Sequence, residues 1–174
     1  MMGEPRWLTP EEAAVWKKYR TLRRELHLAQ DRQLARDSGL SGADYALLAP
    51  LSESPEGVLR FRELALEVGW ERSRLSHQLT RMEKRGLVTR EACPGDARGA
   101  MIRLTRHGRD AIEAAAPQHV EAVRRLFFDP LTPGEMRVLE GFLDRMLAAL
   151  EGESAAHPPN TSAGKAARPG FRPG

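Results

Sequence analysis

The sequence predicts a mainly α-helical fold with one small β-hairpin. Two long stretches near the ends of the chain repeat apolar residues at helical spacing, and two short helical segments joined by a glycine lie between them. Two short β-capable runs on either side of a Pro- and Gly-containing turn come next. The 174 residues suit one domain with appendages, which we place at residues 9–150. Residues 151–174, rich in Gly, Pro, Ala and Ser, are expected to form a disordered tail.

The first long helix is predicted over residues 10–36. Thr9 can cap it, Pro10 has no N–H to lose at the first helical position, and Glu12 can reach back to the cap. Such a helix is more than twice the usual length of about 11–12 residues, so it needs a surface beyond its own compact core. Its apolar stripe consists of Val15, Tyr19, Leu22, Leu26 and Ala29.

The second long helical region is predicted over residues 106–150, capped first by Thr105, with a bend or break at Pro117 and a new start at Thr132-Pro133. The apolar face of its last helix is wide enough to pack on two sides. We therefore expect a homodimer formed by residues 10–36 and 106–150, although both stripes could instead close a monomeric core. The expected dimer contacts are Tyr19, Leu22, Leu139, Phe142, Leu143 and Met146.

Two short helices in the middle of the chain predict a helix-turn-helix over residues 61–85. It is preceded by a short helix from Ser41 to about Leu51 and by a loop over residues 52–57. Ser41 followed by Asp44 is a weaker version of the cap at Thr9. The first helix of the pair begins near Phe61 and ends at Gly69. The second covers residues 70–85 and has a narrow apolar stripe of Leu75, Leu79 and Met82.

The outer face of this second helix is basic and rich in hydroxyl groups. Side chains of these kinds read base edges or bind phosphates when such a helix lies in the major groove. The alternative is an ordinary solvated helix face. The expected DNA-contacting residues of the helix are Arg72, Ser73, Arg74, Ser76, His77, Thr80 and Arg81.

Residues 87–105 predict a β-hairpin directly after the helix-turn-helix, which makes it a wing. Arg98 at its tip is placed to enter an adjacent minor groove, where the negative potential favours a guanidinium. Asp96 would contact DNA poorly, so we expect it to pair with Arg98 and orient it. The fold is therefore a winged helix-turn-helix lobe with long N- and C-terminal dimerisation helices.

The charge distribution supports a local contact with a polyanion. Residues 70–109 hold ten Arg or Lys and four Asp or Glu, a local net charge of +6, although the whole chain has a net charge of only +3. Residues 1–69 and 110–151 are together net acidic, at −5. A solvated basic face would give the same counts, so the motif context has to decide between the two.

Several function classes lack support in the sequence. There is no nucleophile elbow, phosphate-binding loop or pair of carboxylates on a defined face, so we expect no enzymatic activity and no cofactor. The single Cys93 and the scattered histidines predict no metal site, and the thiol is expected to be incidental to its loop. No apolar run approaches membrane-spanning length and no signal segment opens the chain, so we expect a cytoplasmic protein.

Five fragments of the sequence follow one another in the order and at the spacing of a known family: residues 61–65 (FRELA), 72–76 (RSRLS), 81–88 (RMEKRGLV), 96–99 (DARG) and 104–108 (LTRHG). On these fragments the sequence resembles the multiple-antibiotic-resistance regulator (MarR) family of bacterial winged-helix transcription factors. The likeness spans about residues 9–150, and the wing Asp-x-Arg followed by Leu-Thr-x-x-Gly is its most specific part. Glu71 stands where many members have a Ser or Thr cap, and His77 where an Arg is common.

The resemblance implies a homodimer that binds a pseudo-palindromic operator in double-stranded DNA and regulates transcription, usually as a repressor. It also implies relief by a small aromatic ligand in many members, for which Trp16, Tyr19, Arg20 and Tyr45 are the candidate pocket residues by position. The alternative function is a winged-helix protein-interaction module with only nonspecific affinity for nucleic acid. Binding of structured RNA is a weaker alternative.

Overall fold

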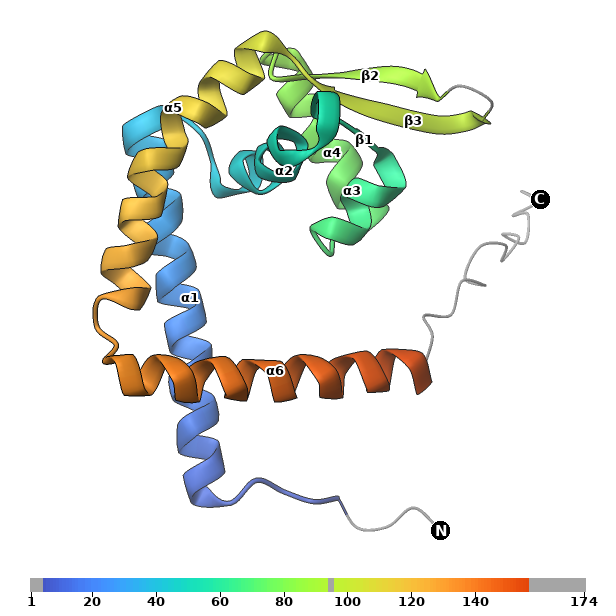
Figure 1. The fold of residues 1–174 in the computed structure, drawn as a ribbon. Coiled ribbons are helices and arrows are strands. Elements are labelled where there is room, and N and C mark those ends of the chain that lie inside the picture. The colour runs from blue at the N-terminus through green and yellow to red at the C-terminus, as the bar shows by residue number, and fades with distance from the viewer. Residues whose placement is uncertain (1–4, 94–95, 157–174) are drawn as a thin grey trace, which may run out of the picture. The chain divides into compact units, whose positions relative to one another are not determined.

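The computed structural model describes residues 5–93 and 96–156, and the chain divides into two compact units at Phe127. The first unit contains five α-helices and a small sheet, and the second contains one long helix; each is described by itself. The mainly α-helical fold with a β-wing is confirmed. In the first unit, α1 (Pro10–Ser38) packs along α5 (Arg106–Val123) (Figure 1). The part of the chain that connects these two helices forms a lobe beside one end of the pair, and this lobe contains α2 (Gly42–Glu53), α3 (Phe61–Glu67) and α4 (Arg72–Lys84).

The sheet has three antiparallel strands in the order β1-β3-β2. The wing consists of β2 (Val88–Cys93) and β3 (Asp96–Leu104), as predicted. The third strand, β1 (Val58–Arg60), was not predicted, because three residues are too few to show an alternating pattern. It pairs with β3 from Val58 opposite Arg103 to Arg60 opposite Met101, and a short 3₁₀ turn (Pro55–Gly57) occupies the end of the expected loop.

The core of the first unit lies between α2, α4, the sheet and the inner ends of α1 and α5. The predicted stripe of α4, Leu75, Leu79 and Met82, is fully buried. Leucines of α2 and Ile102 of β3 pack in the same cluster. By contrast, every residue of α1 from Pro10 to Glu25 is exposed, so only the C-terminal half of this helix contributes to the core.

The capping residues act as the sequence predicts. Thr9 and Glu12 form a reciprocal capping box, and so do Ser41 and Asp44. Thr132 and Glu135 make the same exchange, with Glu135 N–H donating to Thr132 Oγ1 at 3.3 Å and Thr132 N–H donating to Glu135 Oε2 at 2.8 Å. Glu71 at the start of α4 makes no side-chain capping bond.

Two predicted boundaries need correction. Of the predicted bend or break at Pro117, the break is wrong, because helix α5 is continuous through this residue. A turn of π-helix (Arg124–Phe128) follows it. Helix α6 (Pro133–Ala156) of the second unit extends six residues beyond the predicted end at Leu150, so residues 151–156 do not belong to a disordered tail. The reason is that Glu and Ala favour helix, and one interior Gly152 costs only about 1 kcal/mol. The rest of the predicted tail, residues 157–174, lies outside the described residues.

Candidate nucleic-acid interface

The turn of the helix-turn-helix is set by Gly69. Its φ of +62° lies in the left-handed region that glycine adopts without strain. The chain then turns back on α3, and Trp70 N–H donates to the carbonyl of Ala65 at 3.1 Å. Helix α4 starts two residues later at Arg72, which leaves its outer face free of the lobe.

The predicted DNA-contacting residues of α4 lie together on this helix and away from the core. Because the buried stripe occupies the inner side, the opposite side is available to a ligand as large as a duplex. Six of the seven are exposed and Ser76 is half-buried: Arg72, Ser73, Arg74, Ser76, His77, Thr80 and Arg81. These seven residues are called the α4 face below.

One edge of the α4 face is tied to the wing by Arg90 of β2. Its Nη2 donates to the carbonyl of Ser76 at 2.8 Å and to Thr80 Oγ1 at 3.2 Å. Its Nε lies 3.4 Å from a carboxylate oxygen of Glu83. Since the Thr80 hydroxyl also donates to the carbonyl of Ser76, at 3.0 Å, its only donor is already used within α4. Thr80 can therefore act only as an acceptor toward a base.

A basic hollow of about 650 Å³ lies beside this edge, between α3 and the wing. Arg60, Arg62, Arg72 and Arg90 line it, and Phe61 contributes an aromatic wall. The Arg72 guanidinium lies 6.0 Å from the centre of the Phe61 ring, the outer limit of a cation–π contact. Cys93, 6% exposed, is also part of the lining.

The other edge of the α4 face is tied to the N-terminus of α2. The Arg74 guanidinium lies over the ring of Trp70, 4.0 Å from its centre. Arg81 Nη2 donates to Gln78 Oε1, and Gln78 Nε2 donates to Asp44 Oδ1 at 2.7 Å. Arg85 Nη1 donates to Asp44 Oδ2 at 2.6 Å.

Asp44 is the charged centre of this cluster and is only 2% exposed. Burial is the largest single influence on it and opposes ionisation. The hydrogen bonds from the Ser41 N–H and hydroxyl and from Arg85 together outweigh burial, so the pKa of Asp44 lies below its ordinary value. The carboxyl is therefore an anion at neutral pH and acts only as an acceptor.

The wing is fixed to the lobe where β3 enters α5. Thr105 Oγ1 donates to the carbonyl of Gly86 at 2.6 Å and accepts from Gly108 N–H at 2.9 Å. Along the wing, Arg103 makes two hydrogen bonds to the Glu91 carboxylate, at 2.6 and 3.1 Å. The side chains of Asp96 and Arg98 lie outside the described residues, so their predicted pairing stays a prediction.

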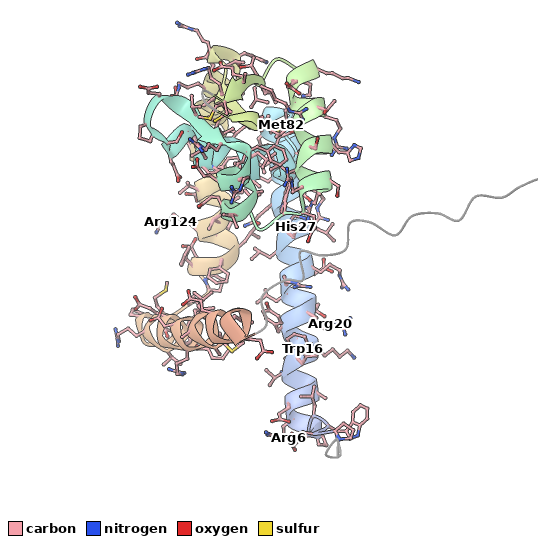
Figure 2. The ribbon with its side chains drawn as sticks, turned by 90° about the vertical axis from the view of Figure 1, so that its right-hand side faces the viewer. Arg6, Trp16, Arg20, His27, Met82 and Arg124 are labelled. Carbon is pink, nitrogen blue, oxygen red and sulfur yellow. The ribbon has the colours of Figure 1, made fainter. Side chains whose placement is uncertain are left out.

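Five of the six predicted dimer contacts are exposed side chains, and the sixth is half-buried. Tyr19 and Leu22 of α1 are about half exposed, at 49% and 53%. On α6, Phe142, Leu143 and Met146 are 44–47% exposed, and Leu139 is half-buried. Figure 2 shows Trp16 on the same projecting stretch of α1.

The four candidate ligand-pocket residues fall into two groups. Trp16 and Tyr19 stack at 5.3 Å between ring centres, and Trp16 and Arg20 line a shallow hollow on α1. Tyr45 is not part of that hollow; its ring centre lies 4.2 Å from that of His119. His119 Nδ1 lies 3.2 Å from Gln33 Oε1, and burial lowers the pKa of this histidine.

Sequence reasoning missed Asp44, Gln78 and Arg90 as parts of the interface. The sequence marks Asp44 only as a capping partner of Ser41, and Arg90 only as one of the ten basic residues over 70–109. The position of Gln78 could have been predicted, because on a helical wheel it lies beside the buried stripe of Leu75 and Met82.

In the part of the chain that the structure describes, no three His, Cys, Asp or Glu side chains are grouped to hold a metal ion, and no helix is long and apolar enough to cross a membrane.

Comparison with known proteins agrees with this architecture. Residues 38–99 match the sequence model of the MarR family. The homoprotocatechuate degradative operon repressor of Escherichia coli is 30% identical over 125 residues, which cover 72% of this chain and 82% of that protein.

Two solved structures from Streptomyces coelicolor extend the similarity to nearly the whole chain. A MarR family transcriptional regulator in complex with DNA is 43% identical, with a TM-score of 0.79 over 91% of this chain and 96% of that one. AbsC, another MarR family regulator, is 39% identical, with a TM-score of 0.79 over 85% and 99% of the two chains. The chain therefore belongs to the MarR family of transcriptional regulators.

Proposed function

We propose that the chain binds a pseudo-palindromic operator in double-stranded DNA as a homodimer and represses transcription. The observation that carries the proposal is the α4 face, a set of exposed Arg, Ser, His and Thr side chains on the second helix of a helix-turn-helix. In this proposal α4 enters the major groove, and Arg98 of the wing enters the adjacent minor groove.

The charge of the lobe supports binding to a duplex. The strong excess of basic residues over 70–109 lies on α4, the wing and the start of α5, and the basic hollow adds Arg60 and Arg62 from β1 and α3. Guanidinium groups at the edge of a recognition helix hold phosphates and fix the register of the protein on the duplex. A similar regulator from Streptomyces coelicolor was solved in complex with DNA.

The homodimer is supported by the exposed apolar faces of α1 and α6. Isolated exposed apolar residues are common, but contiguous stripes on two helices mark an interaction surface. A two-fold dimer presents two α4 faces, which is why the operator should be an inverted repeat.

Repression is supported by the Escherichia coli relative, which is named as the repressor of an operon for homoprotocatechuate degradation. The same name supports testing aromatic acids as ligands that release the operator, as the resemblance implied. Trp16, Tyr19, Arg20 and Tyr45 remain the proposed contacts for such a ligand.

The test is selection of bound duplexes from a random DNA pool at two salt concentrations. We expect enrichment of an inverted repeat with half-sites about one helical turn apart. Salt-sensitive binding that does not depend on the DNA sequence would contradict the proposal and favour the protein-interaction module. Stronger competition by structured RNA than by duplex DNA would contradict it in favour of an RNA-binding role.

A further inference from the structure

The buried side of α4 contains one polar side chain, Gln78. It is 4% exposed and lies among the fully buried Leu75, Leu79 and Met82. A buried amide costs free energy unless its donors and acceptors are paired. Gln78 meets this requirement by bonding to Asp44 on one side and to Arg81 on the other.

The charge on Asp44 determines which way the Gln78 amide faces. An ionised carboxylate only accepts hydrogen bonds, so the NH₂ group of Gln78 has to face it. Gln78 Oε1 then faces the opposite way and accepts from Arg81 Nη2. A flipped amide would place its NH₂ group against the guanidinium, which has only donors.

Asp44 is itself held in place. Its Oδ2 accepts from the Ser41 N–H at 2.9 Å, the Ser41 hydroxyl at 2.8 Å and Arg85 Nη1 at 2.6 Å. Arg85 also donates to the carbonyl of Gly39 at 2.9 Å. The Asp44 carboxylate, fixed at the N-terminus of α2, is thus linked to Arg81 of the α4 face through the side-chain amide of Gln78.

We propose that Asp44 and Gln78 are positioning residues that orient the Arg81 guanidinium toward bound DNA. This inference rests on the proposed function, in which Arg81 contacts the duplex. An arginine held in one orientation before binding loses less conformational entropy when it meets its partner. The arrangement therefore favours one contact geometry for Arg81 and sharpens its preference for one base or phosphate position.

A double-mutant cycle tests the inference, with the duplex enriched by the wild-type protein as the probe. The variants are Gln78→Met, Arg81→Ala and their combination; Met keeps the length of Gln and removes the amide. We expect Arg81→Ala to weaken binding about ten-fold. Gln78→Met should weaken binding about five-fold with Arg81 present, and less than about two-fold with Ala at position 81.

The matched control is Gln118→Met, the same change at an exposed position of α5, which should leave the affinity unchanged. A purely structural role for Gln78 predicts equal losses in both backgrounds, and that result would overturn the inference. An unchanged affinity for Arg81→Ala would also overturn it, since Arg81 would then make no contact to be positioned.

A measurement on the wild-type protein covers the case in which Gln78→Met does not fold. We expect NMR relaxation of the Arg81 Nε–H group in free protein to show an ordered side chain, and that of Arg106, which is 94% exposed, to show a mobile one. Equal mobility of the two would overturn the inference. A wild-type protein that enriches no duplex, while Arg81 is ordered, would locate the failure in the proposed function instead.

Discussion

Arg90 of the wing donates a 2.8 Å hydrogen bond to the carbonyl of Ser76 in α4. The contact joins residues 14 positions apart and links strand β2 to helix α4. With the further contacts of Arg90 to Thr80 and Glu83, it makes this side chain a direct link between the wing and the α4 face.

Replacement of Arg90 should therefore loosen the wing relative to α4. We expect Arg90→Met to weaken binding of the selected duplex by about 1–2 kcal/mol, because a wing that is no longer tied to α4 has to be ordered when it binds. The control is Arg103→Met, which removes the same charge from the wing but breaks only the bonds to Glu91. Fluorescence-anisotropy titration measures the affinity of both variants for the duplex. Equal losses of affinity would show that Arg90 contributes only through its charge.

Gly108 should tolerate no side chain. A Cβ there would lie 2.0 Å from the carbonyl oxygen of Leu87, which is backbone and cannot move aside. We expect Gly108→Ala to destabilise the fold by at least about 2 kcal/mol in urea denaturation. Gly152→Ala in α6 is the control, because a Cβ at that position would meet nothing within 4 Å, and it should be neutral or stabilising by about 0.5–1 kcal/mol.

The Asp44 carboxylate should make the free energy of unfolding depend on pH. Its folded pKa lies below the unfolded value of about 3.9, so its stabilising effect is present above that pH and is lost as the pH falls through the folded pKa. We expect Asp44→Asn to lower the free energy of unfolding at pH 7 by about 1–3 kcal/mol, since the bond from Arg85 loses its charge partner.

The difference between wild type and Asp44→Asn should then shrink below about pH 3.9, which denaturant titrations at several pH values would record. Asp110→Asn serves as the control; Asp110 is 64% exposed and pairs with Arg106 at 4.0 Å, so its loss should cost less than about 0.5 kcal/mol. A constant difference across the pH range would show that Asp44 acts through shape and not through charge.

The apolar face of α6 should form part of the dimer interface. Met146→Arg places a charge in that face, and we expect monomers in sedimentation velocity because a buried unpaired charge is costly. Ala148→Arg adds the same charge to the same helix on its other side and should leave the dimer intact. A dimeric Met146→Arg protein would contradict the predicted interface.

Arg98 remains the predicted minor-groove contact of the wing. Arg98→Ala should weaken binding by about 1–3 kcal/mol if the guanidinium reads the groove. The loss should be larger on duplexes whose flanking sequence is an A-tract, because a narrow minor groove has a more negative potential. An affinity that does not change on either duplex would remove Arg98 from the interface.

The order and boundaries of most elements were predictable because local chemistry sets them. Thr9, Ser41, Thr105 and Thr132 cap the helices they were expected to cap, since a capping bond spans only three residues. The apolar stripe of Leu75, Leu79 and Met82 follows from helical spacing alone, and it in turn places the α4 face outward.

Only the tertiary structure determines which contacts hold the α4 face in place. Asp44 and Gln78 are 34 positions apart, and Arg90 meets Ser76 across 14, so no local pattern pairs them. The strand β1 exists only because β3 offers an edge to pair with, and Gly108 is required only because Leu87 comes close to it. Sequence determines where charge and apolar surface lie along each helix, whereas contacts between distant segments exist only after the chain has packed, when burial makes each polar group find a partner.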